Sequence, residues 1–357
     1  MHITDRRTFI WECAAFAATG CTSMRRVRQE DAVRAELRRQ IDEGLMAGCV
    51  CGIVGGALFA AGERTRHPSS SPMTADCVFD LASVGKTFTA SLCARLVADG
   101  RLDPDAPFTD YLPEHVLAKE GCPITVRDLA THTGGFDNSK PYILPDPEAF
   151  DRALYAKRPV RPRGEKYEYA CSNFIYLGRI VERVTGTDLE SAARTLLWQP
   201  LGMADTCWHE VVGNPRAVET FTNGRLPPGA HGDESARVYP RAMGNGSAFS
   251  TAGDMLKFAG DLLARRTFPK AYYDLLLTPC YEKGGVRCSF GWDMDAGLHR
   301  PPGWSAATVA HGGYTGNTVA VDPALGFAGV VLTNRTGDRL KAYAGHGRLL
   351  ALMSETL

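Results

Sequence analysis

The sequence contains no long apolar run: none of its apolar stretches reaches about eighteen residues, the length that a membrane-spanning helix needs. An excess of one charge is also absent, because 40 lysines and arginines balance 40 aspartates and glutamates. Basic blocks interleaved with aromatic residues are missing as well. We therefore expect neither nucleic acid nor an anionic membrane surface to be recruited by charge.

The cysteines lack the spacing of a metal site. There are eleven of them, an odd number, and none forms a C-x-x-C pair or stands at ligand spacing from a histidine. Cysteines scattered in apolar surroundings are mostly small buried side chains. We expect no metal site and no cofactor.

The first 21 residues resemble an export leader. Arg6 and Arg7 precede a short alanine-rich run, as in a bacterial twin-arginine signal, and residues 18–21 resemble a lipoprotein cleavage box with Cys21 as the lipidated residue. Glu12 interrupts the apolar run, so a frayed cytoplasmic terminus is the alternative. We expect residues 1–21 to be a signal and the protein to reside in the bacterial periplasm or cell envelope, anchored through Cys21.

The whole chain of 357 residues has the ordinary composition of a globular protein, with 44% hydrophobic residues, and we expect residues 22–357 to form the folded domain. Apolar residues at every fourth position predict a helix over 31–45 and another from Ser83 to about Gly100. Residues 48–62 read as two strands joined at Gly55-Gly56. Further strands are expected within 288–296, 307–313, 318–323 and 327–335, before a last helix from about Arg339.

This order of elements predicts the fold class. Strands near both ends with helices between them indicate an α/β (α+β) protein, in which both termini complete one antiparallel sheet flanked by helices. The segment from about 100 to 285 is expected to form an inserted, mainly helical region.

Residues 83–87, Ser-Val-Gly-Lys-Thr, allow two kinds of site. Gly85-Lys86-Thr87 could end a phosphate-binding loop, but such a loop needs a glycine five positions before Gly85, where the chain has Asp80. Alternatively, Ser83 begins a helix with Lys86 on the same face, three residues on. A lysine is a base only when it is neutral, so we expect burial and positive potential to lower the pKa of Lys86.

The surroundings of this motif favour the serine. Residues 79–113 with 124–136, then 164–186, then 310–317 closely resemble, in order, the motif segments of the penicillin-recognising serine hydrolases. That superfamily includes class C β-lactamases, DD-carboxypeptidases, D-aminopeptidases and family VIII esterases. The resemblance covers nearly all of 31–357 and implies a β-lactamase/transpeptidase fold.

The resemblance implies roles for individual residues. Ser83 is the nucleophile, Lys86 its base, and Tyr169 the residue that passes the proton to the leaving group, with Tyr167 as a nearby rival. Cys171 departs from the family pattern, which has Asn or Asp there to hold the lysine. Either Asn173 or Ser172 supplies that bond, or the lysine is less well oriented.

The segment after residue 310 is expected to bind substrate. His311, Gly312 and Gly313 match the family's K/H-x-G strand, against which a substrate lies as an added strand. The backbone N–H of Tyr314, together with that of Ser83, is expected to form the oxyanion hole, and Asn173 is expected among the substrate-binding residues. We expect His311 to titrate near neutral pH and to contact a substrate carboxylate. His132 is expected to be structural.

These roles imply hydrolysis through an acyl-serine intermediate, of a small-molecule ester or amide or of a peptidoglycan-like peptide. Esterase or D-aminopeptidase/DD-carboxypeptidase activity is favoured over efficient β-lactamase activity, since a neutral histidine replaces the usual lysine. Cys171 keeps an alternative open: a penicillin-binding sensor or scaffold that is acylated without efficient turnover.

Overall fold

A computed structural model describes residues 27–239, 241–295 and 299–355. It begins with a helix over 27–42, followed by the strands β1 (Met46–Ile53) and β2 (Leu58–Thr65), which pair antiparallel. The predicted first helix and hairpin are therefore confirmed, with the turn at Gly55 in a left-handed conformation (φ 82°).

The main sheet of the described residues is antiparallel and has nine strands. Strands from both ends of the sequence, β1 and β11, lie side by side within it. β1 pairs with β11 (Phe327–Arg335), which pairs with β10 (Asn317–Asp322), and β10 pairs with β9 (Val309–Gly313). The order is β3-β2-β1-β11-β10-β9-β8-β7-β6, with β3 at Ser71–Pro72, β6 at Tyr281–Lys283, β7 at Val286–Ser289 and β8 at Trp292–Asp293. The predicted sheet completed by both termini is confirmed.

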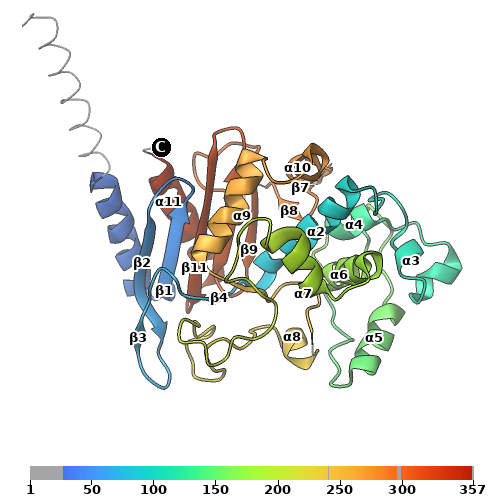
Figure 1. Cartoon of the computed structure of the whole chain (residues 1–357), viewed down its shortest axis with the longest axis horizontal. Coiled ribbons are helices and arrows are strands. Elements are labelled where there is room, and N and C mark those ends of the chain that lie inside the picture. Colours follow the sequence, from blue (N-terminus) through green and yellow to red (C-terminus); the bar gives the residue numbers. More distant parts are fainter. Residues whose placement is uncertain (1–26, 240, 296–298, 356–357) are drawn as a thin grey trace, which may run out of the picture.

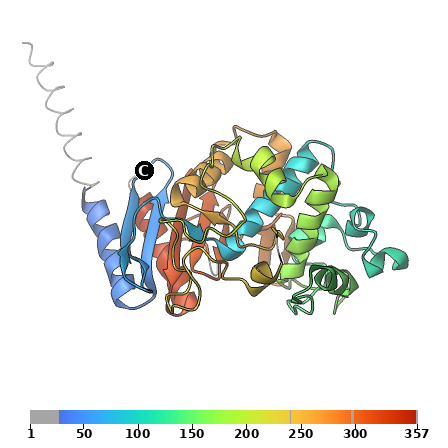
Figure 2. The same ribbon diagram turned by 60° about the horizontal axis from the view of Figure 1, so that its bottom comes forward.

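Strand alternation divides the core between the two faces of this sheet. Val330 and Leu332 of β11 join the larger core, against which α9 (Ala252–Ala264) packs, whereas Val331 joins a smaller core. Helix 27–42 and α11 (Arg339–Ser354) cover this smaller core, to which they contribute Val33, Leu37, Leu349, Leu350 and Met353. Figures 1 and 2 show these two terminal helices together at the sheet end of the molecule.

The predicted helical region lies on the other side of the molecule, to the right in Figure 1. Its helices are α3 (Phe108–Tyr111), α4 (Val126–Ala130), α5 (Pro147–Ala156), α6 (Cys171–Thr185), α7 (Leu189–Ala193), α8 (Glu234–Val238) and α10 (Lys270–Leu277). The short strands β4 (Phe79–Asp80) and β5 (Phe249–Ser250) form a separate pair.

Helix α2 (Lys86–Ala98) lies between the sheet and the helical region. Ten of its side chains are buried, including Phe88 and Leu92, whose spacing predicted it. Within the described ranges, no helix is both long enough and apolar enough to cross a bilayer.

Candidate active site

A tight turn presents Ser83 at the start of α2. β4 ends at Asp80, and a 3₁₀ turn, Ala82–Gly85, precedes the α-helix. Ala82 has a positive φ of 46°, and its N–H donates to Asp80 Oδ1 at 2.8 Å. Asp80 is therefore a structural carboxylate that holds a strained residue directly before the serine.

The side chains of Ser83, Lys86 and Tyr169 meet in the structure. Ser83 Oγ lies 2.7 Å from Tyr169 Oη, and Lys86 Nζ donates to Ser83 Oγ at 3.2 Å. Tyr167, the rival tyrosine, has no such contact with Ser83 among the hydrogen bonds of the described residues. The serine thus has two groups beside its hydroxyl that can take or return a proton.

Lys86 is completely buried, with 0% of its surface exposed. Its ammonium group donates to the backbone carbonyl of Asn245 and lies 3.9 Å from Cys171 Sγ. Gly85 allows the segment of Asn245 and Gly246 to pack closely against the start of α2, because a Cβ at position 85 would lie only 3.1 Å from the backbone of Gly246. The Asn245 carbonyl is a contact that the sequence did not reveal, since a backbone acceptor leaves no residue signature.

The pKa of Lys86 moves in the opposite direction to the one expected. Burial does oppose its charged form, but ionisation of Cys171 and Tyr169 favours it, and the pKa of Lys86 is raised above its ordinary value. Burial also raises the pKa of Tyr169, and it outweighs the nearby charge of Lys86, which lowers that pKa. The expectation of a lowered lysine pKa is wrong, because it overlooked the two acidic neighbours on the Tyr169 segment.

His132 holds the Tyr169 segment in place. Its ring nitrogen Nδ1 accepts from the Ala170 N–H at 3.2 Å and from Asn173 Nδ2 at 3.0 Å, and its ring centre lies 4.7 Å from that of Tyr169. Burial keeps the pKa of His132 well below its ordinary value, so it stays neutral. His132 is structural, as expected.

Asn173 and Ser172 do not replace the missing Asn or Asp at position 171. Asn173 is fully buried, donates its hydrogen bond to His132 and does not line the cleft described below. Ser172 Oγ has no hydrogen-bond partner among the described residues. The thiol of Cys171 itself is what lies beside Lys86.

Strand β9 carries the predicted His311-Gly312-Gly313 segment to the serine. Alternation along β9 turns His311 to the same face as Val309, toward the helical region. A Cβ at Gly313 would lie 2.4 Å from the Leu81 carbonyl oxygen, so this glycine allows the strand to touch the turn before Ser83. The next residue, Tyr314, is 56% exposed at the rim of the cleft.

The pKa of His311 also differs from expectation. Burial, with the nearby charges of Lys86 and His299, lowers it to about 3. His311 Nδ1 donates to the Gly312 carbonyl at 3.0 Å, which fixes a neutral tautomer. The predicted titration of His311 near neutral pH is therefore wrong.

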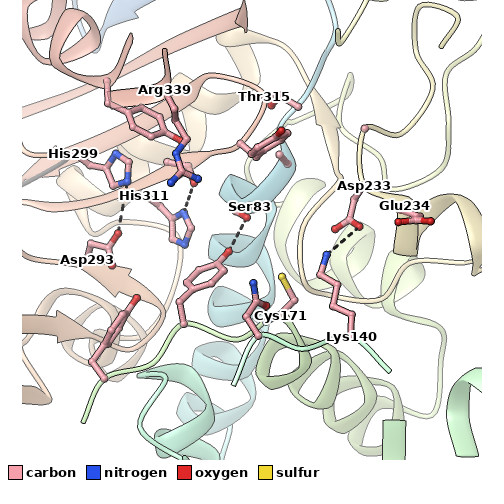
Figure 3. A pocket seen from close by; sticks show the side chains of 18 residues that line it. Ser83, Lys140, Cys171, Asp233, Glu234, Asp293, His299, His311, Thr315 and Arg339 are labelled. Atoms are coloured by element: carbon pink, nitrogen blue, oxygen red, sulfur yellow. Dashed lines mark hydrogen bonds and ion pairs between the residues drawn. The ribbon is translucent and has the colours of Figure 1, made fainter. Parts of the chain in front are cut away.

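A cleft of about 840 Å³ opens over Ser83. Figure 3 shows Lys140, Asp233 and Glu234 at one end of it, and His311, His299, Asp293 and Arg339 at the other, with Ser83 between. The two ends differ in how their charges pair. At the first end, Lys140 lies 3.7 Å from Asp233; at the second, the single ion-pair partner of Asp293 among the described residues is His299, at 3.9 Å. Apart from His311, these end residues belong to no recognised motif, and sequence reasoning missed them.

The described residues contain no group of three or more His, Cys, Asp or Glu side chains that could hold a metal ion. Cys21, with Arg6 and Arg7, lies outside the described residues.

Comparison with known proteins identifies relatives among the beta-lactamases and related hydrolases. A family model for beta-lactamases matches residues 38–353. Esterase EstB of Burkholderia gladioli is 31% identical over 312 residues, 74% of this chain and 79% of EstB. An N-acetylmuramyl-L-alanine amidase of Bacillus subtilis (strain 168) is 25% identical over 320 residues, 78% of this chain and 72% of the amidase.

Among solved structures, a beta-lactamase/D-alanine carboxypeptidase from Pseudomonas syringae superposes with a TM-score of 0.75 at 19% identity, over 91% of this chain and 98% of that one. This likeness shows a shared fold. The named relatives are enzymes, so the alternative of an acylated sensor without turnover is not favoured.

Proposed function

Since the chain belongs to the beta-lactamase family and is a serine hydrolase, we propose that it hydrolyses carboxylic esters through an acyl-enzyme on Ser83. The observation that carries this proposal is the pair of contacts at Ser83 Oγ, 2.7 Å to Tyr169 Oη and 3.2 Å to Lys86 Nζ. These distances suit proton transfer from the attacking hydroxyl.

Acylation begins when the Lys86–Tyr169 pair has lost one proton, since an ammonium beside a phenol offers no base. Ser83 Oγ then attacks the ester carbonyl carbon, and its proton enters the pair as the new C–O bond forms. Tyr169 Oη returns a proton to the ester oxygen as the bond to the leaving alcohol breaks. The pair is again one proton short, and the acyl group is on Ser83.

Deacylation runs by the reverse route with water. The water oxygen attacks the acyl carbon and its proton enters the pair, after which the bond to Ser83 Oγ breaks and the serine regains its proton. The backbone N–H groups of Ser83 and Tyr314 would bind the carbonyl oxygen in both tetrahedral intermediates. The close packing of Gly313 against Leu81 supports this role, because it brings the segment that contains Tyr314 next to the turn that contains Ser83.

Two observations favour esters over lactams and peptides. His311 is neutral, so it offers no charge to the carboxylate that a lactam or a C-terminal peptide carries. An alcohol also leaves more readily than an amine, which suits a site whose proton donor, Tyr169, has a raised pKa. The esterase relative EstB supports the same preference.

The test compares p-nitrophenyl butyrate, D-alanine p-nitroanilide and a chromogenic cephalosporin, with intact-mass detection of adducts. We expect steady turnover of the ester to exceed that of the other two. Ser83→Ala should abolish turnover and labelling by a fluorophosphonate, whereas Ser69→Ala, at an exposed serine outside the cleft, should keep both. A fluorophosphonate adduct on Ser83→Ala, or a stable acyl adduct on the wild type without turnover, would contradict the proposal.

We further propose export through residues 1–21 and lipidation of Cys21, from the sequence alone. Replacing Arg6 and Arg7 by lysine should keep the protein in the cytoplasm, and Cys21→Ser should release it from the membrane fraction. Unchanged fractionation of both variants would contradict the proposal.

A further inference from the structure

The Tyr169 side of the cleft leads to His311. The ring of Tyr169, whose Oη would protonate the leaving oxygen, packs on His132, His132 packs on Tyr167, and Tyr167 lines the cleft together with Asp293 and His311. We therefore take this end of the cleft as the side on which the leaving group departs. We call His299, Asp293 and His311 the leaving-group corner; Figure 3 shows them on the side of Ser83 away from Lys140.

His311 presents an acceptor to this corner. Its Nδ1–H is used by the Gly312 carbonyl, and its pKa of about 3 keeps the second ring nitrogen unprotonated. Nε2 therefore has a lone pair and no proton to donate.

His299 lies beside Asp293 and has a second acceptor, which is enclosed by protein. Its side chain is only 9% exposed, and its ring lies against Tyr343 with 4.5 Å between the ring centres. Nε2 faces Asp293 Oδ2 at 3.9 Å, so the carboxylate favours the tautomer with the proton on Nε2. Nδ1 is then a buried lone pair, and no described residue donates a hydrogen bond to it.

Asp293 adds a carboxylate that lacks a cation. None of the hydrogen bonds within the described residues reaches its carboxyl oxygens. Burial and the charge of Asp295 raise its pKa to about 7, while burial and the charge of Arg339 lower the pKa of His299 to about 4, so the two form no ion pair. A buried acceptor in a folded protein almost always has a donor, and His299 Nδ1 lacks one among the described residues; Asp293, with 35% of its side chain exposed, faces the cleft without a cation.

We propose that the leaving-group corner binds a protonated amine carried by the leaving group of the ester. An ammonium has three donors and no acceptor, which matches the lone pair of His311 Nε2 and the carboxyl group of Asp293, both of which line the cleft. This inference rests on the proposed function, since it takes the corner to be the leaving-group side. It makes amino-bearing alcohols and phenols the preferred leaving groups.

A carboxylate on the leaving group is the competing possibility, because Arg339 lines the same cleft. Arg339 is exposed at the start of α11, so water screens part of its charge, whereas the side chain of His299 is 9% exposed and that of Asp293 is 35% exposed. A carboxylate in the corner would meet the charge of Asp293 and the lone pair of His311 Nε2, so the geometry disfavours it.

The experiment uses the phenolic butyrate esters of tyramine, tyrosol and hydroxyphenylpropionic acid. They share the phenol and the two-carbon chain and differ in its end, which is an ammonium, a hydroxyl or a carboxylate. For the wild type we expect kcat/KM for the tyramine ester to exceed that for the tyrosol ester by about tenfold to a hundredfold. The carboxylate ester should be the poorest of the three.

Asp293→Asn should remove the advantage of the tyramine ester over the tyrosol ester, and His299→Ala should reduce it. Glu234→Gln is the matched control: it removes a carboxylate from the opposite end of the cleft and should keep the ratio. A ratio near one in the wild type, or a ratio unchanged in Asp293→Asn, would overturn the proposal. Preference for the carboxylate ester, lost in Arg339→Gln, would overturn it too.

A binding measurement separates this inference from the proposed function. Tyramine should bind the Ser83→Ala protein in a calorimetric titration, and Asp293→Asn in the same background should weaken that binding by about tenfold or more. If the wild type hydrolysed none of the three esters, the proposed function would be contradicted. The tyramine titration would still test whether the leaving-group corner binds an ammonium group.

Discussion

The imidazole of His299 occupies the space that a side chain at position 312 would need. A Cβ built on Gly312 would lie 2.1 Å from His299 Cε1, well inside van der Waals contact. The glycine of the His311-Gly312-Gly313 segment therefore allows a residue from a different loop to lie directly on strand β9.

Gly312→Ala should displace His299 and destabilise the protein. Forcing a methyl group into an occupied space typically lowers the free energy of unfolding by about 1 to 3 kcal/mol. We expect a lower midpoint of thermal unfolding for Gly312→Ala, and little further loss when Ala replaces Gly312 in a His299→Ala background.

Gly253→Ala is the control for this comparison. Gly253 lies in α9, and a Cβ there would approach no atom closer than 3.8 Å, so alanine should be neutral or stabilising. Equal losses for Gly312→Ala with and without His299 would show that the imidazole is not the obstacle.

Tyr169→Phe should slow hydrolysis most for poor leaving groups. A p-nitrophenol leaves without much protonation, whereas an alkyl alcohol or an amine needs a proton from Tyr169 Oη. We expect losses of about two to four powers of ten for an alkyl ester and a smaller loss for the p-nitrophenyl ester. Tyr167→Phe is the matched variant, and a leaving-group-dependent loss there instead would move the proton donor to Tyr167.

The raised pKa of Lys86 predicts an alkaline pH profile. Below its pKa, the fraction of a group that has lost its proton rises about tenfold per pH unit, so kcat/KM for a neutral ester should climb through neutral pH. Cys171 raises the pKa of Lys86, so Cys171→Ala should shift this rise to lower pH and Cys171→Asp to higher pH. Cys207→Ala, at a half-buried cysteine outside the cleft, should leave the profile unchanged; equal profiles for all three variants would mean that Cys171 does not tune the lysine.

The strands, the helix after Ser83 and the sheet completed by both termini could be predicted because each leaves a local pattern in the chain. The proximity of Lys86 to Ser83 followed from their spacing, and that of Tyr169 from the resemblance to the penicillin-recognising serine hydrolases. The pKa values of Lys86 and His311 could not be predicted, because they depend on burial and on Cys171 and His299, which come from other segments. Neither the Asn245 carbonyl nor the Asp293–His299 contact has a sequence signal, since only folding brings them to the cleft.

The pKa of Asp293 gives a prediction for stability. Its folded pKa of about 7 lies above its ordinary value of 3.8, so the folded protein binds this proton more tightly than the unfolded chain does. The stability of the wild type relative to Asp293→Asn should therefore be highest below pH 4 and fall as the pH rises to about 7. Because 35% of the side chain is exposed, solvent screens part of the effect.

Thermal unfolding of both proteins from pH 4 to pH 8 checks this. We expect nearly equal midpoints at pH 4 and a more stable Asn variant at pH 8. Asp322→Asn is the control of opposite sign: burial works against the Asp322 charge, but the N–H groups of Leu325 and Ser305 outweigh it and lower the pKa. That variant should be destabilised at neutral pH, and less so in acid. The prediction would be contradicted if the difference in midpoint between wild type and Asp293→Asn did not change with pH. Asp293 would then keep its charge on folding without a cost in stability, because a donor within the protein already binds its carboxylate.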